Sequence, residues 1–303
     1  MHFSPLTVSD YNNLKIFFYN QRYQLSTYSL FSLIVWSNSN SRAHFAITDD
    51  TLIISNEPDD QYNGRHLILP LSHKRIISPD YLYNLARNTG FMRYCFVPET
   101  YLIKHGMSQL ERYFKVTEQS EFADYIYLTE NLIKLKGNKY SKQRNLIHQF
   151  QKAYLDKGTV SIEMVRTDNL TECLSFLDKW CDQHGCDHDQ NESMACEKVA
   201  AINALNNIGE MESKSILIRI NGTVRAFGIS SYLTDNMGVL NFEKADSNIK
   251  GLYQFLDNQC ATRLFSQYKY INKESDMNLP NLAQSKNAYN PVMKLKSYCL
   301  TLH

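Results

Sequence analysis

The stretch SILIRINGTVRAFGISSY, residues 215–232, decides how the second half of the chain folds. Ser215 to Ile220 and Val224 to Tyr232 are rich in β-branched and aromatic residues, and Asn221-Gly222 joins them. Asn-Gly between two such runs is the strongest short-range signal for a β-hairpin, because both residues accept the positive φ angles of a tight turn. The sequence therefore predicts two antiparallel strands here.

The segments on either side extend this hairpin into a mixed α/β domain. Residues 159–165 alternate like a strand, and residues 169–183 and 193–206 carry apolar side chains at helical spacing. After the hairpin we expect a strand at 239–245, a helix at 249–267, a strand at 268–273, a short helix at 279–287 and a strand at 291–298. The order β-α-α-β-β-β-α-β-α-β resembles that of the GNAT (N-acetyltransferase-like) superfamily, a resemblance of topology that fixes no chemistry.

The first half of the chain gives a looser version of the same pattern. It predicts a helix at 10–21, a hairpin at 43–55 turning at Asp49-Asp50, a strand at 66–71, a helix at 81–88 ended by Gly90, and a strand at 93–97. We therefore predict an α/β (α+β) fold of two tandem GNAT-like domains, each a mixed, mostly antiparallel sheet flanked by helices. The boundary is expected at Lys157-Gly158, which gives domains 1–157 and 158–303.

Length and composition are those of a folded globular protein rather than a disordered or membrane-spanning one. The chain has 303 residues, of which 43% are hydrophobic and 21% charged, so it can bury two cores. The longest nearly apolar stretch, Leu30 to Trp36, is far shorter than the ~20 residues of a bilayer span, and the N-terminus lacks a signal sequence. We expect a cytoplasmic protein, with the inner membrane surface as the place where a lipid partner would be met. The seven Cys favour reduced thiols over a disulfide framework.

Positive charge is concentrated in one segment although the formal net charge is only +1. Residues 131–155 contain no Asp or Glu. A helix whose charges serve only solubility would interleave Glu with Lys. This segment therefore predicts a surface that binds tRNA, a lipid headgroup or a nucleotide, and the alternative is a solvated helix face. The candidate anion-binding residues are Lys136, Lys139, Lys142, Arg144 and Asn145.

Six short segments carry a resemblance to a known family. They are DYIYL at 124–128, LKGNKYSKQRN at 135–145, FEKAD at 242–246, GLYQ at 251–254, YINKESD at 270–276 and SKNAYNP at 285–291. Together they resemble the family typified by the C-terminal domain of bacterial phosphatidylglycerol lysyltransferases, related to the Fem-type aminoacyl transferases. The resemblance implies tandem GNAT-like domains and transfer of an amino acid from aminoacyl-tRNA to a lipid headgroup.

The sequence departs from that family where an anion would be held. Lys273, Asn278 and residues 281–284 stand where the family more usually has an Arg, a Gly and a Gly-Leu-Arg run. Because Arg grips phosphate or carboxylate bidentately and Lys is a point charge, the bound anion need not be a lipid phosphate.

Ionisable residues on a strand expected to be central mark the candidate active site. Alternation places Lys244 and Asp246 on one face with Phe242, and Glu243 on the other with Asn241 and Ala245. Such a strand rarely carries three ionisable groups without a use, although a structural ion-pair network would also explain them. We predict that Glu243 or Asp246 accepts the nucleophile's proton and that Tyr289 supplies a hydroxyl to the leaving oxygen. The candidate substrate-binding residues are Lys244, Lys286, Asn272, Glu274, Asp276, Glu197 and Gly251.

The turn before the helix at 249–267 bears on the cofactor. Acetyl-CoA users of this superfamily carry a Gly-rich turn there, because the backbone must approach the pyrophosphate closely. Here only Gly251 remains, and Tyr253 occupies the place of the second small residue. This disfavours CoA, and Gly251 could simply allow tight helix packing.

The segment from Cys181 to Asp189 holds Cys, His and Asp residues, but its spacing does not follow the paired ligands of structural zinc. We expect no cofactor and no metal. The function predicted from the sequence is transfer of an amino acid from an activated ester, of the aminoacyl-tRNA type, to an amine or hydroxyl on a lipid headgroup or peptide. The alternatives are a CoA-dependent N-acyltransferase and a non-catalytic protein that binds a small anion.

Overall fold

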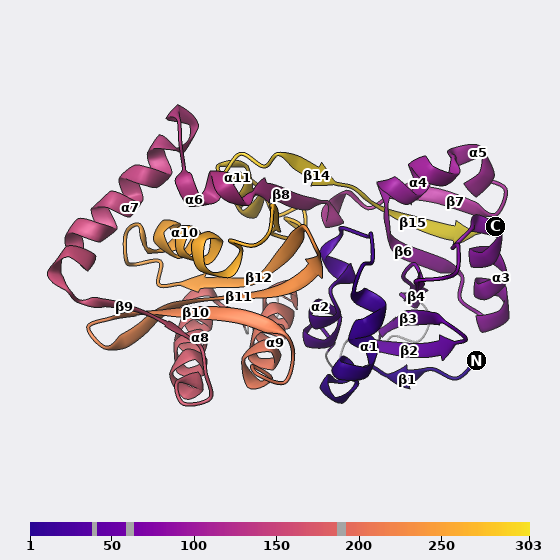
Figure 1. Ribbon diagram of the computed structural model, residues 1–303, viewed down its shortest axis with the longest axis horizontal. Helices are drawn as coiled ribbons and strands as arrows, with labels where there is room; N and C mark the ends of the chain where they lie inside the picture. The colour runs from indigo at the N-terminus through magenta and orange to yellow at the C-terminus, as the bar shows by residue number, and fades with distance from the viewer. Residues whose placement is uncertain (38–40, 59–63, 187–191) are drawn as a thin grey trace.

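The computed structural model describes residues 1–37, 41–58, 64–186 and 192–303, which build two mixed β-sheets with helices packed on them (Figure 1). The predicted fold class, mixed α/β with two GNAT-like sheets, is confirmed. Both termini lie in the half that holds the first sheet, the N-terminus next to β1 and the C-terminus at the end of β15 (Figure 1). No helix in these described ranges combines the length and the apolar character needed to cross a membrane.

The first sheet has the strand order β1-β2-β3-β4-β6-β15-β7, and β5 pairs with β3. Its strands are β1 (Ser4–Pro5), β2 (Ser41–Thr48), β3 (Thr51–Pro58), β4 (His66–Leu67), β5 (Leu71–Ser72), β6 (Arg93–Pro98), β7 (Phe114–Glu118) and β15 (Ser297–Leu302). The helices of this half are α1 (Tyr11–Phe18), α2 (Leu30–Val35), α3 (Pro79–Thr89), α4 (Glu99–His105) and α5 (Met107–Leu110). The strand predicted at 66–71 is divided into the short strands β4 and β5.

The second sheet has the order β14-β8-β13-β12-β11-β10-β9. Its strands are β8 (Asp124–Leu128), β9 (Val160–Met164), β10 (Ser213–Ile220), β11 (Thr223–Thr234), β12 (Met237–Ala245), β13 (Tyr270–Asn272) and β14 (Met293–Leu295). Helices α8 (Leu170–His184) and α9 (Glu192–Asn206) lie on one face (Figure 1). The other face carries α6 (Thr129–Lys134), α7 (Ser141–Ala153), α10 (Leu252–Leu264) and α11 (Pro280–Asn287) (Figure 1).

The hairpin predicted from Asn221-Gly222 forms as expected. Both residues have positive φ angles, 51° and 77°, and Ile220 pairs directly with Thr223 across a two-residue turn. The helix predicted at 81–88 is α3, which begins after Ser78, whose Oγ accepts a hydrogen bond from the Tyr81 backbone N–H. Gly90, with φ 76°, ends it as predicted.

The two sheets exchange strands, which the sequence did not predict. β8 precedes residue 157 but lies in the second sheet, and β15 returns from the C-terminal half to lie between β6 and β7. The boundary predicted at 157–158 therefore falls between α7 and β9, within the chain that builds the second sheet. The single strand predicted at 291–298 is two strands, β14 and β15, one in each sheet.

The second sheet opens where β12 and β13 separate. These strands run parallel, and their pairing ends at Val239 opposite Asn272. Beyond this point the chain stays with β8 instead, because the Lys273 N–H donates to the Tyr125 carbonyl at 3.0 Å. The Tyr125 N–H in turn donates to the Glu274 carbonyl at 3.1 Å. Within the described residues, the rest of β12 has no backbone partner on this side, so the sheet splays open here.

A β-bulge in β12 changes which side chains face the splay. The register with β11 shifts between Phe242, opposite Ile229, and Leu240, opposite Ser230, which leaves Asn241 unpaired in the ladder. Val239 and Phe242 consequently belong to the same core, although strict alternation would separate them. Asn241 and Glu243, predicted on one face of the strand, both line the cavity described below, and Asn241 Nδ2 donates to Ser32 Oγ of α2 at 2.8 Å.

Gly251 is needed for packing. It has φ 83°, and a Cβ built on it would lie 2.1 Å from the Leu146 carbonyl oxygen of α7. Gly158 has a similar φ of 69° but open space where its Cβ would be. Substitution at Gly158 would therefore introduce backbone strain alone, whereas substitution at Gly251 would add a clash between α7 and the start of α10.

We predict that Gly251→Ala lowers the free energy of unfolding by more than the ~1–3 kcal/mol of a strained backbone alone, because α7 must also move. Gly158→Ala, the matched control, should cost only the backbone strain. Urea denaturation of both variants measures the difference. Equal losses would mean that the α7 contact contributes nothing to stability.

Candidate functional site

A cavity of about 750 Å³ opens at the splay and lies between the two halves of the chain. Asn241 and Glu243 of β12 line one side, and Lys273 and Glu274, which follow β13, line the other. Its volume is within the ~300–1,000 Å³ usual for small-molecule sites. The sheet opening is therefore also a place where a substrate can enter.

Lys273 joins the two sides of the splay through a buried ion cluster. Its Nζ lies 2.6 Å from Asp257 Oδ2 of α10 and 3.2 Å from Glu243 Oε2 of β12. Burial alone would lower the pKa of Lys273, but the two carboxylates outweigh this effect and raise the pKa well above its ordinary value. Burial raises the pKa of Glu243 to about 7, and the Lys273 charge limits the rise. A carboxylate whose pKa is near neutrality can take up and release a proton at neutral pH.

Two further predicted residues lie at the same cavity. Lys286 of α11 donates from Nζ to the carbonyl oxygens of Lys273 and Glu274. Burial lowers the pKa of Lys286 to about 8 and raises that of Glu274 to about 8. Tyr289 also lines the cavity, and burial followed by the nearby Asp257 charge raises the pKa of its hydroxyl well above the ordinary value. The tyrosine is therefore a neutral hydroxyl at any physiological pH.

Lys244 and Glu197 pair with each other on the opposite face of β12. Lys244 Nζ lies 2.7 Å from Glu197 Oε1 and 3.9 Å from the centroid of the Trp180 ring. Trp180 Nε1 donates to the Tyr253 hydroxyl at 3.0 Å, and both Glu197 and Tyr253 line the cavity. The charge predicted to hold an anion is thus already compensated by Glu197, as a buried charge must be.

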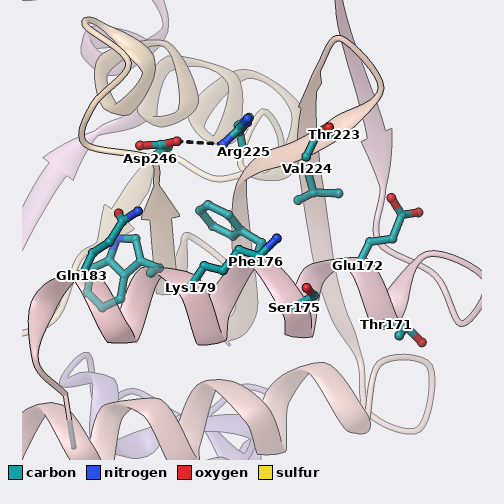
Figure 2. Close-up of a pocket in the computed structure, with 11 residues that line it drawn as sticks. Thr171, Glu172, Ser175, Phe176, Lys179, Gln183, Thr223, Val224, Arg225 and Asp246 are labelled. Atoms are coloured by element: carbon teal, nitrogen blue, oxygen red, sulfur yellow. Dashed lines mark hydrogen bonds and ion pairs between the residues drawn. The ribbon is translucent and has the colours of Figure 1, made fainter.

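Asp246 lies apart from Glu243, in a smaller cleft of about 360 Å³ between α8 and the start of β11 (Figure 2). Its Oδ2 lies 3.2 Å from Nη1 of Arg225, and its Oδ1 accepts from the Asn248 backbone N–H at 3.0 Å. Asp246 therefore holds the turn between β12 and α10. The structure does not bring the two predicted catalytic carboxylates together, because they alternate across the strand.

Three more predicted substrate-binding residues have structural contacts. Asn272 Nδ2 donates to the Gln24 carbonyl at 3.0 Å and to Asp124 Oδ2 at 2.8 Å, which ties the two halves together. Asp276 accepts from the Tyr125 hydroxyl and from the Asn278 N–H. Gly251 packs against α7, as described above.

The basic residues lie on and before α7, at the end of the molecule far from the first sheet (Figure 1). Arg144 Nη1 donates to the carbonyl oxygens of Leu135 and Gly137, so its guanidinium fixes the turn that precedes the helix. The other predicted anion-binding residues are exposed: Lys136, Lys139, Lys142 and Asn145. These four side chains are accessible to an anionic partner, and Lys139 Nζ also lies 5.1 Å from the centroid of the Tyr140 ring.

Metal ligands do not gather anywhere in the ranges that the structure describes, where no group of three or more His, Cys, Asp or Glu is arranged to hold an ion. Asp187, His188 and Asp189 of the Cys- and His-containing segment lie outside the described residues. The described cysteines are free thiols.

Sequence reasoning missed Asp257 and the contribution of the first half. Asp257 is a buried acid in the middle of α10, and only its place one helical turn from Tyr253 could have indicated that it faces the same cavity. The first half contributes residues of α2, β2, β3, β4 and β6, and no Asp, Glu, Lys or Arg is among those that line the cavity. Its part in the site follows only from the strand exchange.

The GNAT-like sheet and the cavity at its splay define the class of protein, and comparison with known families gives the family. The chain belongs to the family described as phosphatidylglycerol lysyltransferase, C-terminal, whose model matches residues 89–301. Family and fold together indicate an acyl or aminoacyl transferase. No curated protein matches the chain.

Two solved structures share the fold of this chain. A conserved protein of unknown function from Bacteroides thetaiotaomicron VPI-5482 is 27% identical, with 99% of each chain covered and a TM-score of 0.87. The C-terminal domain (DUF2156) of a putative lysylphosphatidylglycerol synthetase from Agrobacterium fabrum is 12% identical, with 97% of this chain and 91% of that chain covered and a TM-score of 0.63. The second likeness concerns the fold alone.

We predict that Lys273→Met costs about 3–5 kcal/mol of the free energy of unfolding, because it leaves Glu243 and Asp257 facing each other without their cation. Lys269→Met, at an exposed position, should change stability by less than about 0.5 kcal/mol and serves as the control. Urea unfolding at pH 7 measures both. A loss below about 1 kcal/mol would contradict the view that this cluster stabilises the splay.

A pH dependence follows from Glu274. Between its ordinary pKa of 4.5 and the folded value of about 8, the folded protein keeps a proton that the unfolded chain has released. The free energy of unfolding should therefore fall as the pH rises through this window. Glu243 adds a fall of the same sign up to about pH 7.

We predict that Glu274→Gln makes the fall between pH 7 and 8 shallower, since Glu274 is the carboxyl that still titrates there. Urea unfolding at half-unit pH intervals from 5 to 8 measures the slope. Exposed Glu210→Gln is the control and should keep the wild-type slope. An unchanged slope in Glu274→Gln would show that this carboxyl is already ionised at low pH.

Proposed function

We propose that the chain is an aminoacyl transferase that moves an amino acid from an aminoacyl ester to an amine or hydroxyl acceptor. The observation that carries the proposal is Glu243 on the side of the cavity, with a pKa of about 7 beside the buried Lys273. Perturbed carboxylates in a cavity of suitable size are the usual mark of proton-transfer chemistry. Family and fold supply the reaction class, and this carboxylate supplies the base.

In the proposed reaction the acceptor attacks the carbonyl carbon of the ester. The acceptor loses its proton to Glu243 as the new C–N or C–O bond forms and the ester C–O bond breaks. The leaving oxygen takes up a proton, for which the neutral Tyr289 hydroxyl is the candidate donor. The ammonium of Lys286, partly buried at the cavity, would stabilise the negative charge on the carbonyl oxygen.

The turn before α10 supports an ester donor of the aminoacyl-tRNA type over CoA. Gly251 lies against α7, and the Asn248 N–H already donates to Asp246, so these groups of the turn are engaged within the chain. Tyr253 lines the cavity where the superfamily pattern has a small residue. The exposed Lys136, Lys139 and Lys142 offer a surface for a tRNA backbone.

The acceptor is an amine or a hydroxyl, on a lipid headgroup or a peptide. Lys273 stands where the family resemblance has an Arg, and its ammonium is held by Asp257 and Glu243. This supports an acceptor recognised in some other way than through a phosphate at this position. Purified protein incubated with labelled aminoacyl-tRNAs and with separate lipid and peptide extracts would identify both substrates.

We predict that Glu243→Gln lowers the transfer rate by about 10²–10⁴-fold while the fold is kept, since Lys273 still has Asp257 as its partner. The wild-type rate should rise with pH through about 7 as Glu243 ionises, and the variant should lose this rise. Exposed Asp168→Asn is the control.

An unchanged rate in Glu243→Gln would remove Glu243 as the base. Absence of transfer from every aminoacyl-tRNA, with binding of small anions, would support the non-catalytic alternative. Turnover with acetyl-CoA, or a clear rise in Tm on adding it, would support a CoA-dependent acyltransferase.

A further inference from the structure

The cavity has two chemically different ends, and the end built by the first half is uncharged, with apolar side chains as its largest. These are Leu33 and Trp36 at α2, Ile54 of β3, Ile68, Phe96 of β6 and Phe122. Smaller uncharged polar side chains line it as well: Ser26, Thr27, Ser32, Ser37, Ser55 and Asn56. Of the described lining residues that precede residue 124, none is Asp, Glu, Lys or Arg. Apart from His66, the ionisable groups of the cavity belong to β8, α9, β12, α10, α11, the segment between β13 and α11, and the turn after α11.

At the boundary of this end, His66 supplies no charge, and the Asp124 carboxylate is engaged by hydrogen bonds within the chain. Burial lowers the pKa of His66, so this imidazole is neutral at pH 7, and its Nδ1 lies 2.7 Å from the Gly64 carbonyl. Asp124 accepts hydrogen bonds from Ser26 and from Asn272 Nδ2. An ammonium group placed among Trp36, Phe96 and Phe122 would lose its hydration and meet no carboxylate from the first half, and contacts with the aromatic rings would return only part of that cost.

The aromatic side chains of this end are held in place by the fold. The rings of Phe96 and Phe122 have centroids 5.0 Å apart, and the Trp36 ring stacks on Phe242 at 6.1 Å. Phe96 has a φ of 55°, rare for an aromatic residue, and two hydrogen bonds fix it. Its N–H donates to Gln119 Oε1 at 2.8 Å, and its carbonyl accepts from the Tyr28 hydroxyl at 3.1 Å. Backbone strain held in this way is found at ligand clamps.

From this division of the cavity we infer that the first-half end binds an uncharged apolar group, of the size of an aromatic or branched aliphatic side chain, attached to the reacting head of a substrate. The inference rests on the proposed function, since the head is placed at Glu243 and Lys286. It selects against a lysyl or arginyl side chain at this end. Trp36, Phe96 and Phe122 are then specificity-determining residues.

The apolar group could come from the transferred amino acid or from the acceptor, and small probes distinguish the two. L-phenylalaninamide and L-leucinamide carry the α-ammonium and carbonyl of the donor, and phenethylamine carries only an acceptor amine. L-lysinamide is the charged comparison. We expect calorimetric titration of the full chain to give at least about tenfold tighter binding of phenylalaninamide or leucinamide than of lysinamide, the scale on which a pocket discriminates by apolar contacts. Phenethylamine that binds as tightly as phenylalaninamide would assign the group to the acceptor.

A substitution at Phe122 tests the location of this end. Phe122→Asp should weaken binding of phenylalaninamide and strengthen that of lysinamide, while Phe122→Leu should keep the wild-type order. Ile103→Asp, at a position 75% exposed and outside the cavity, is the control for an added carboxylate. A reversal of preference is a result that mere loss of stability would not produce.

Several outcomes would overturn the inference: wild-type protein that binds lysinamide as tightly as phenylalaninamide, no binding of any apolar probe, or a Phe122→Asp variant that folds and keeps the wild-type order. The inference and the proposed function can fail separately. Transfer from Lys-tRNA but not from Phe- or Leu-tRNA, with no preference for phenethylamine over lysinamide, would keep the function and refute the inference. Tight binding of phenylalaninamide without transfer from any aminoacyl-tRNA would support the inference and refute the proposed function.

Discussion

The buried contact of Lys273 with Asp257 and Glu243 is the interaction on which the second sheet depends. Beyond Val239 and Asn272 the backbone no longer joins β12 to the segment that follows β13, and this ion cluster spans the gap from the side of α10. Three buried charged groups are costly unless each has a partner, so the position of α10 and the direction of the chain after β13 are tightly constrained. The sheet can therefore open a cavity and still keep its two edges at a fixed separation.

The same contact gives a structural role to Lys273, at the position where the family resemblance implies an arginine. The compact ammonium of Lys273 donates to carboxylates that come from different elements, α10 and β12. Lysine at this position is thus consistent with a structural cation that also controls the pKa of Glu243. Because Asp257 and Glu243 hold the Lys273 ammonium, it is less available to a substrate anion.

Local patterns predicted much of the fold, and long-range partners account for what they missed. The Asn221-Gly222 turn and the Gly90 helix end are set by backbone preferences of single residues, which a sequence states directly. The exchange of β8 and β15 depends on which strands meet in space, and nothing in the periodicity of residues 291–298 reports the partner. At the site, Glu243 and Glu274 were predicted because charges on a strand are conspicuous. Asp257 was missed because an acid on a helix is ordinary.

The strand exchange also explains why a single cavity needs both halves of the chain. β8 lies beside β13 in the second sheet, and its first residue, Asp124, is hydrogen-bonded to Ser26 of the first half. β15 returns the chain end to the first sheet, between β6 and β7. The first half of the chain supplies β8 to the second sheet, and the second half supplies β15 to the first sheet. This exchange holds Phe96 of β6 at a fixed distance from the ionisable groups around β12. A rigid pairing of an apolar end with a charged end follows from this topology, and neither sheet alone could supply it.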